Sequence, residues 1–181
     1  MRKFIRILIM SGLLFKLIGC SMNSENIETD HSNNPDDKPG MVGYVVDRES
    51  SRILVVDPVP QDFSSTGGLS EFHNAIWFSN VPEEIEIGEK VQVWFDMVAE
   101  SYPGQSEAIK ISIIKSEKPD NADLTEAEAI HRALTSDEWK KKGITVIKSV
   151  NYDAEEDVWV VQIKQDDDEY SLQVVDSTTL K

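Results

Sequence analysis

The chain has few of the residues that build active sites. Its 181 residues include one cysteine and three histidines, so no disulfide can form within the chain, and neither the His-x-x-x-His spacing of zinc sites nor the Gly-x-Ser-x-Gly segment of many hydrolases occurs. No apolar run reaches the roughly 20 residues that a transmembrane helix needs. Basic residues are also scarce, because 18 of them stand against 33 acidic ones, for a formal net charge of -15. We therefore expect no catalytic residues, no metal, no cofactor and no nucleic-acid partner.

The single cysteine, Cys20, lies at the end of a segment with an export pattern. Three of the first six residues are basic, an apolar run follows, and that run ends at Leu17-Ile18-Gly19-Cys20. A basic start, a short apolar run and a small residue before a cleavage point are typical of a secretory signal peptide. The last four residues have the form of a lipobox, so the sequence resembles those of bacterial lipoproteins. The alternative, a short apolar helix that ends in Gly-Cys by chance, stays open.

The resemblance to lipoproteins implies a location. Residues 1–19 would be a signal peptide, removed by cleavage between Gly19 and Cys20. The Cys20 thiol would carry a diacylglycerol, and acyl chains such as palmitate would hold the protein in the cell membrane. The folded part would then lie at the extracytoplasmic face of the membrane, as in Gram-positive bacteria.

Two polar stretches divide the rest of the chain. Residues 20–40 are rich in Asn, Ser and Asp and nearly lack apolar groups, so we expect a disordered tether. The second stretch, "SEKPDNAD" at 116–123, separates two regions with regular hydrophobic patterns. We therefore expect two small domains, at 41–117 and 122–181.

The first of these domains consists of predicted strands. Runs rich in β-branched and aromatic residues, bounded by turn residues, indicate antiparallel strands. They occur at residues 42–47, 52–57, 75–80, 89–98 and 108–115. Five short strands predict a small OB-like β-barrel, although hydrophobic alternation alone does not distinguish a barrel from a sandwich.

The second domain begins with a predicted helix, "LTEAEAIHRAL". Thr125 and Glu128 have the spacing of a capping box, which marks the first turn of a helix. Three predicted strands follow at 144–152, 157–165 and 169–176, joined by acidic turns. The sequence thus predicts a small α-β-β-β domain, and the fold class of the whole chain would be α+β.

Each predicted domain resembles a known family. The helix "LTEAEAIHRAL" and the segment "VNYDAEEDVWVVQIKQDDDEYSLQVVDSTT" are similar to the PepSY domain, although the glycine that usually ends that domain is missing. PepSY domains occur in protease propeptides and cell-surface proteins, which implies an inhibitory or regulatory role. The segments "GYVVD", "AIWFS", "IGEKVQVWFD" and "ESYPGQSEA" resemble the YobA-like family of short Gram-positive lipoproteins, whose function is unknown.

Three aromatic residues are candidates for a ligand-binding surface on the predicted barrel. Trp77 and Trp94 alternate with residues that we expect to face the core, and Tyr102 lies in the turn "SYPGQ". Exposed aromatic rings on an OB-like face commonly stack on a ligand. Alternatively, the two tryptophans are covered by the loop at 58–74 or by the second domain.

The acidic turns of the second domain could suggest calcium. One cluster lies at 153–157 and the other at 166–169, and the strand between them has eight or nine residues. At about 3.3 Å per residue, the two clusters lie too far apart to share one ion, and neither has the spaced ligands of a calcium loop. We expect solvated turns.

The sequence favours a protein that binds over one that catalyses. The first hypothesis is a protein-interaction or regulatory module, with a secreted or membrane protein as partner and a protease as one candidate. The second is a binder of small ligands or cell-wall glycans that uses Trp77, Trp94 and Tyr102.

Overall fold

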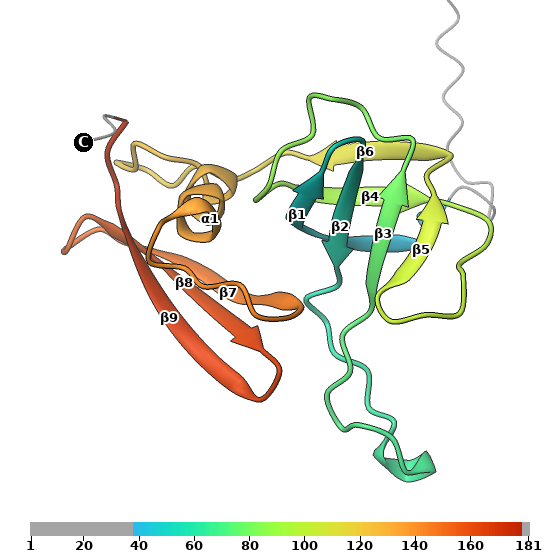
Figure 1. Cartoon of the computed structure of the whole chain (residues 1–181). Coiled ribbons are helices and arrows are strands. Elements are labelled where there is room, and N and C mark those ends of the chain that lie inside the picture. The colour runs from blue at the N-terminus through green and yellow to red at the C-terminus, as the bar shows by residue number, and fades with distance from the viewer. Residues whose placement is uncertain (1–37, 179–181) are drawn as a thin grey trace, which may run out of the picture. The chain divides into compact units, whose positions relative to one another are not determined.

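Residues 38–178 are described by the structure, a computed structural model (Figure 1). This part of the chain is mostly β, and α1, its only α-helix, is too short and too polar to cross a membrane. The elements are β1 (Met41–Glu49), β2 (Arg52–Val56), a 3-10 helix (Ser64–Thr66), β3 (Ala75–Ser79), β4 (Lys90–Trp94), β5 (Gly104–Glu107), β6 (Lys110–Ile114), α1 (Glu126–Thr135), β7 (Thr145–Asp153), β8 (Val158–Gln165) and β9 (Asp168–Val175).

The first sheet has six strands in the order β5-β3-β2-β1-β4-β6. All neighbours are antiparallel except β3 and β5, which pair in parallel, with Ile76 opposite Gly104. The predicted closed barrel of five antiparallel strands is therefore wrong. The observed sheet has one strand more than predicted. This strand, β5, consists of "GQSE", which the sequence pattern assigns to a turn because the segment is short and polar. The sheet ends at β5 on one side and at β6 on the other, and these two edges do not pair.

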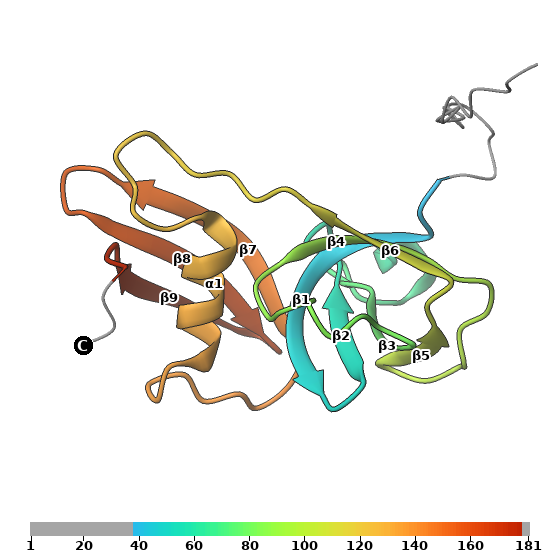
Figure 2. The same ribbon diagram turned by 90° about the horizontal axis from the view of Figure 1, so that it is seen from above.

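The second sheet has three antiparallel strands, β7, β8 and β9, and α1 lies across one of its faces (Figures 1 and 2). The predicted capping box is confirmed, because the Thr125 side chain accepts from the Glu128 backbone and the Glu128 carboxylate accepts from Thr125 N–H. The helix then buries Ala129, Ile130 and Ala133, the small and branched residues of one stripe. This stripe packs against the sheet.

The two sheets share one hydrophobic cluster. Alternation along β2 sends Leu54 and Val56 to the face where they join Ile130 of α1 and Val161 and Ile163 of β8. Ile53 and Val55, which alternate with them along β2, point to the other face and form a second cluster with Phe78 and Val91 within the six-stranded sheet. The helix and the second sheet share their core with side chains from β1 to β3, so the predicted α-β-β-β domain is wrong. The predicted α+β class is also wrong, because the described residues are mostly strand and contain one short α-helix. The boundaries at 41–117 and 122–181 stay a prediction, as does the likeness to PepSY sequences.

Direct contacts also connect the first sheet to the helix. The Tyr44 hydroxyl donates to Glu126 Oε1 at 2.6 Å, and His131 Nδ1 lies 2.9 Å from the Ile87 carbonyl oxygen. Gly88 has a positive φ of 99°, and a Cβ there would lie 2.3 Å from the Ala127 carbonyl oxygen. The loop before β4 therefore approaches α1 so closely that only glycine fits.

A buried carboxylate joins the end of β9 to the start of the helix. Asp176 is 4% exposed and accepts three hydrogen bonds: from Asp123 N–H at 2.5 Å, Leu124 N–H at 2.9 Å and Trp159 Nε1 at 3.0 Å. Burial by itself would raise the pKa of Asp176, but the three donors outweigh it and hold the pKa below its usual range. The carboxylate therefore stays charged and fixes β9, β8 and the entry to α1 together.

A second carboxylate, Glu71, joins the β2–β3 loop to the three-stranded sheet. Glu71 forms ion pairs with Lys148 of β7 and with Lys164 of β8, the latter at 2.5 Å, and it lies 3.2 Å from His73 Nε2. Hydrogen bonds from Lys148, Lys164 and His73, in that order of effect, lower the pKa of Glu71 from 4.5 to about 2.

Replacement of Asp176 by alanine should lower the free energy of unfolding by about 3 kcal/mol, because two backbone N–H groups and an indole N–H lose a charged acceptor. Urea denaturation of the two proteins measures the difference. Asp120→Ala, at an exposed turn, is the control and should leave the urea midpoint unchanged. Equal midpoints for Asp176→Ala and the parent would contradict the role given to this carboxylate.

Glu71→Gln should change how stability depends on pH. The folded pKa of Glu71 is about 2 and the ordinary value is 4.5, so its ionised form stabilises the fold above about pH 5, and this contribution is lost as the pH falls from about 4.5 towards 2. The stability difference between parent and Glu71→Gln should thus be largest near neutral pH and shrink in acid. Urea midpoints at several pH values test this, with exposed Glu83→Gln as the control. A difference that is constant with pH would refute it.

Candidate functional site

The outer edge of the three-stranded sheet is the backbone of β9. β8 pairs with β9 along its whole length, from Val158 opposite Val175 to Gln165 opposite Asp168. On its other side, β9 has no strand neighbour within residues 38–178. An edge strand of eight residues presents a row of N–H and C=O groups that another strand can pair with.

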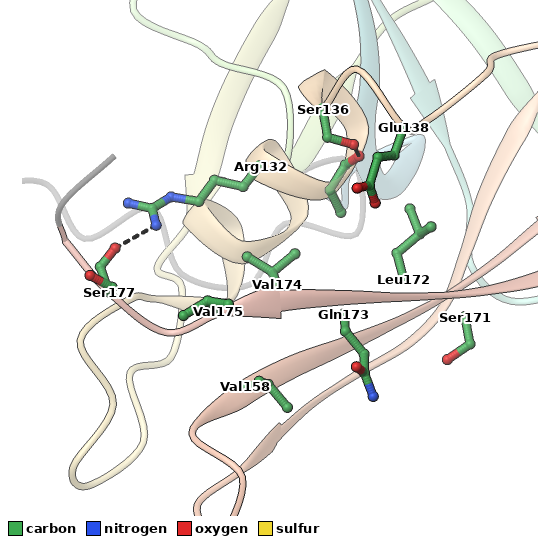
Figure 3. A pocket seen from close by; sticks show the side chains of 11 residues that line it. Arg132, Ser136, Glu138, Val158, Ser171, Leu172, Gln173, Val174, Val175 and Ser177 are labelled. Carbon is green, nitrogen blue, oxygen red and sulfur yellow. Dashed lines mark hydrogen bonds between the residues drawn. The ribbon is translucent and has the colours of Figure 1, made fainter. Parts of the chain in front are cut away.

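A groove of about 820 Å³ runs along this edge, between β9 and the C-terminal half of α1 (Figure 3). Figure 3 shows Leu172 and Val174 on the helix side of β9, with Ser171 and Gln173 on the opposite side. The complete lining comprises Arg132, Ala133, Ser136, Glu138, Val158, Ser171, Leu172, Gln173, Val174, Val175 and Ser177. Most of the exposed surface in the groove is apolar, although six of its eleven lining residues are polar or charged, with one charge of each sign.

The position of the groove wall is determined by contacts that start from α1. The Arg132 guanidinium donates to the Ser177 carbonyl oxygen at 2.5 Å, which holds the chain beyond β9 against the helix (Figure 3). At the end of α1, the Ser136 hydroxyl donates to the Ala133 carbonyl oxygen at 3.0 Å. The Ser136 bond lies within the end of the helix, whereas the Arg132 bond and the hydrogen bonds of the buried Asp176 join the end of β9 to α1 and its entry.

Part of the sheet face opposite α1 carries uncharged side chains, and the next pair on this face, Lys164 with Glu169, is charged. Register places three pairs there: Val158 with Val175, Val160 with Gln173, and Gln162 with Ser171. Gln162 Nε2 donates to the Ser171 hydroxyl at 2.9 Å, and Val175 is 67% exposed. We call these six residues the neutral face. In a chain with 28% charged residues, such a surface has the composition found at the centre of protein interfaces.

Sequence patterns alone do not select the β9 edge or the neutral face as a site. A signal was present in the alternation of "DVWVVQIKQ", because the residues between Trp159, Val161 and Ile163 must point away from the core. That β9 would be an edge does not follow from the sequence, since strand order depends on the tertiary arrangement.

The predicted lipidation and cleavage residues, Cys20 and Gly19, lie outside the described residues. Trp77 is half-buried and packs against the shared cluster, with the guanidinium of Arg52 4.6 Å and the ammonium of Lys141 6.0 Å from its ring. Trp94 is also half-buried, with the Lys110 ammonium 4.3 Å from its ring. Trp77 is thus partly covered by the shared cluster, whereas Trp94 lies beside Lys110 of β6, and the ligand-binding role of both stays a prediction.

Tyr102 has different surroundings. It is 55% exposed, its hydroxyl donates to the His73 carbonyl oxygen at 3.0 Å, and its ring lies 5.3 Å from that of Phe72. Burial and then the nearby Asp166 raise the pKa of Tyr102. It lines a cleft of about 450 Å³ between the β2–β3 loop and the second sheet, to which neither tryptophan contributes. The small-ligand hypothesis stays a prediction, and of its three residues Tyr102 is the one in a cleft.

Comparisons with known proteins concern mainly the six-stranded sheet. Residues 42–115 match the family model described as a protein of unknown function, DUF3221. The chain is 26% identical over 121 residues to the uncharacterized protein YobA of Bacillus subtilis (strain 168), a match that covers 61% of this chain and 96% of the relative. A crystal structure of a YobA protein from B. subtilis matches with 24% identity and a TM-score of 0.30, over 41% of this chain and 91% of the other. The first part of the chain is therefore similar to the DUF3221 family and to YobA, both of unknown function.

Proposed function

We propose that the protein is a lipid-anchored, extracytoplasmic binding module, and that an extended segment of a partner protein adds to the free edge of β9. The observation that carries the proposal is the edge of β9, which has no strand neighbour within residues 38–178 and lies in a groove whose lining includes four residues of the neutral face. The partner would be a secreted or membrane protein, with a protease as one candidate.

Strand addition explains why the three features occur together. The backbone of the added segment would form hydrogen bonds with the backbone of β9, and these bonds would contribute affinity whatever side chains the segment carries. Side chains of an extended segment alternate between two sides. One set would enter the groove beside Ala133, Leu172 and Val174, while the other set would extend the neutral face beside Val175. Occupancy of the edge would also protect a strand that is otherwise open to uncontrolled pairing.

Val175→Lys should block this mode of binding. Lysine is a residue with which proteins protect their edge strands, and Val175 is exposed, so the substitution should not affect folding. Peptides selected from a displayed library on the chain beginning at residue 20, with Cys20→Ser, should bind the parent and lose at least about tenfold in affinity to Val175→Lys. Hydrogen exchange should slow in β9 when the peptide binds.

The matched control is Val59→Lys, a substitution at an equally exposed valine in the β2–β3 loop, which should leave peptide affinity unchanged. Peptides that bind both lysine variants equally, or that protect amides elsewhere than in β9, would contradict strand addition.

Cys20→Ala should separate the protein from the membrane. Without the thiol there is no acceptor for the diacylglycerol, and no helix within residues 38–178 is long and apolar enough to cross a membrane. Labelled palmitate should enter the parent and a Ser21→Ala control, but not Cys20→Ala, which should be recovered from the medium. Retention of unlabelled Cys20→Ala in the membrane fraction would rule out the anchor.

A further inference from the structure

Two acidic turns border the neutral face, one at each end of β8. The β7–β8 turn contains Asp153, Glu155, Glu156 and Asp157, and the β8–β9 turn contains Asp166, Asp167, Asp168 and Glu169. All eight residues are exposed. The surface beside β9 is thus uncharged in the middle and negative at both ends.

These carboxylates have no cationic side chain bound to them in the described part of the chain. Their hydrogen bonds come from neutral donors: Asp153 accepts from the Glu155 and Glu156 N–H groups, and Asp157 accepts from the Tyr152 hydroxyl at 2.8 Å. The Asp157 hydrogen bond, followed by burial, raises the pKa of Tyr152 to about 12. The negative charge of the turns is therefore not neutralised internally.

Three basic residues near this surface already have partners, and a fourth, Lys142, precedes Gly143, which lies close to the Asp166 carboxylate. Lys164, on the same side of β8 as the neutral face, and Lys148 both form ion pairs with Glu71. The hydrogen bond to Glu71 is the main cause of the raised pKa of Lys164, and Asp167 and Glu169 add smaller effects. On the helix side, Arg132 is bound to the Ser177 carbonyl oxygen.

The spacing of the turns indicates what could neutralise them. β8 has eight residues, so its ends lie about 23 Å apart, and an extended segment of about eight residues along β9 spans the same distance. Building on the proposed function, we propose that the partner segment has an uncharged centre with lysine or arginine at both ends, one basic end beside each acidic turn. Such complementarity would select the partner and speed its association.

The same charges disfavour a second copy of this chain at the edge. If two β9 strands paired in antiparallel fashion, the 166–169 turn of one copy would approach the 153–157 turn of the other. In a parallel pair, like turns would meet. Either arrangement brings acidic groups together without a basic partner, which is unfavourable.

Three synthetic peptides test the proposal. They share an alternating threonine–valine centre and differ in their ends, which carry two lysines, two serines or two glutamates each. Against the chain beginning at residue 20, with Cys20→Ser, the lysine peptide should bind at least about tenfold more tightly than the serine peptide, and added salt should reduce the difference. The glutamate peptide should bind weakest.

Paired substitutions locate the effect. Glu155→Gln with Glu156→Gln at one turn, and Asp166→Asn with Asp167→Asn at the other, should each lower affinity for the lysine peptide about three- to tenfold, with little change for the serine peptide. The matched control, Glu83→Gln with Glu84→Gln, removes two exposed charges from the β3–β4 loop and should change neither affinity.

Other outcomes separate this inference from strand addition. If lysine and serine peptides bind equally and both are lost in Val175→Lys, the basic partner is refuted while the use of the edge stands. If binding of every peptide is insensitive to Val175→Lys, strand addition itself fails. A dimer in sedimentation equilibrium that dissociates in Val175→Lys would replace the basic segment by a second copy as the occupant of the edge.

Discussion

The hydrogen-bonded carboxylate of Asp176 is the constraint on which the second half of the molecule depends. It follows directly on β9, yet its three donors belong to β8 and to the chain that enters α1. A carboxylate stays ionised in such a buried position only when neighbouring groups donate hydrogen bonds to it. The hydrogen bonds from Asp123, Leu124 and Trp159 determine how far β9 lies from the helix and so keep the groove open.

The shared hydrophobic cluster is the second feature on which the arrangement of α1 and the three-stranded sheet depends. Three strands and one ten-residue helix have little apolar surface to bury, and the cluster adds Tyr44, Leu54 and Val56 from the first sheet. The YobA-like sheet thereby supports the part of the chain that lies beyond the family match. Buried side chains, the Glu71 ion pairs and the close approach of Gly88 to α1 all act across this junction. The three-stranded sheet thus shares its core with the first sheet, which also has a cluster of its own.

Local features of the fold follow well from the sequence, and long-range ones do not. The capping box at Thr125 and the strand positions are recognisable because they depend on neighbouring residues and on alternation. The closed barrel is wrong because "GQSE" pairs in parallel with β3, a contact that no local pattern indicates. For the same reason, the edge position of β9 was not expected. The grouping of Trp77, Trp94 and Tyr102 assumed one common face, whereas the structure places these side chains in three different environments.

The alternation along β8 has a consequence for how this protein can change in evolution. Trp159, Val161 and Ile163 are constrained by packing, whereas Val158, Val160 and Gln162 contact the core little. Under the proposed strand addition, mutations at the second set would alter which segment the surface accepts while leaving the free energy of folding nearly as it was. Stability and the proposed recognition would then be encoded in alternate residues of one strand, so that selection for a new partner need not compete with selection for the fold.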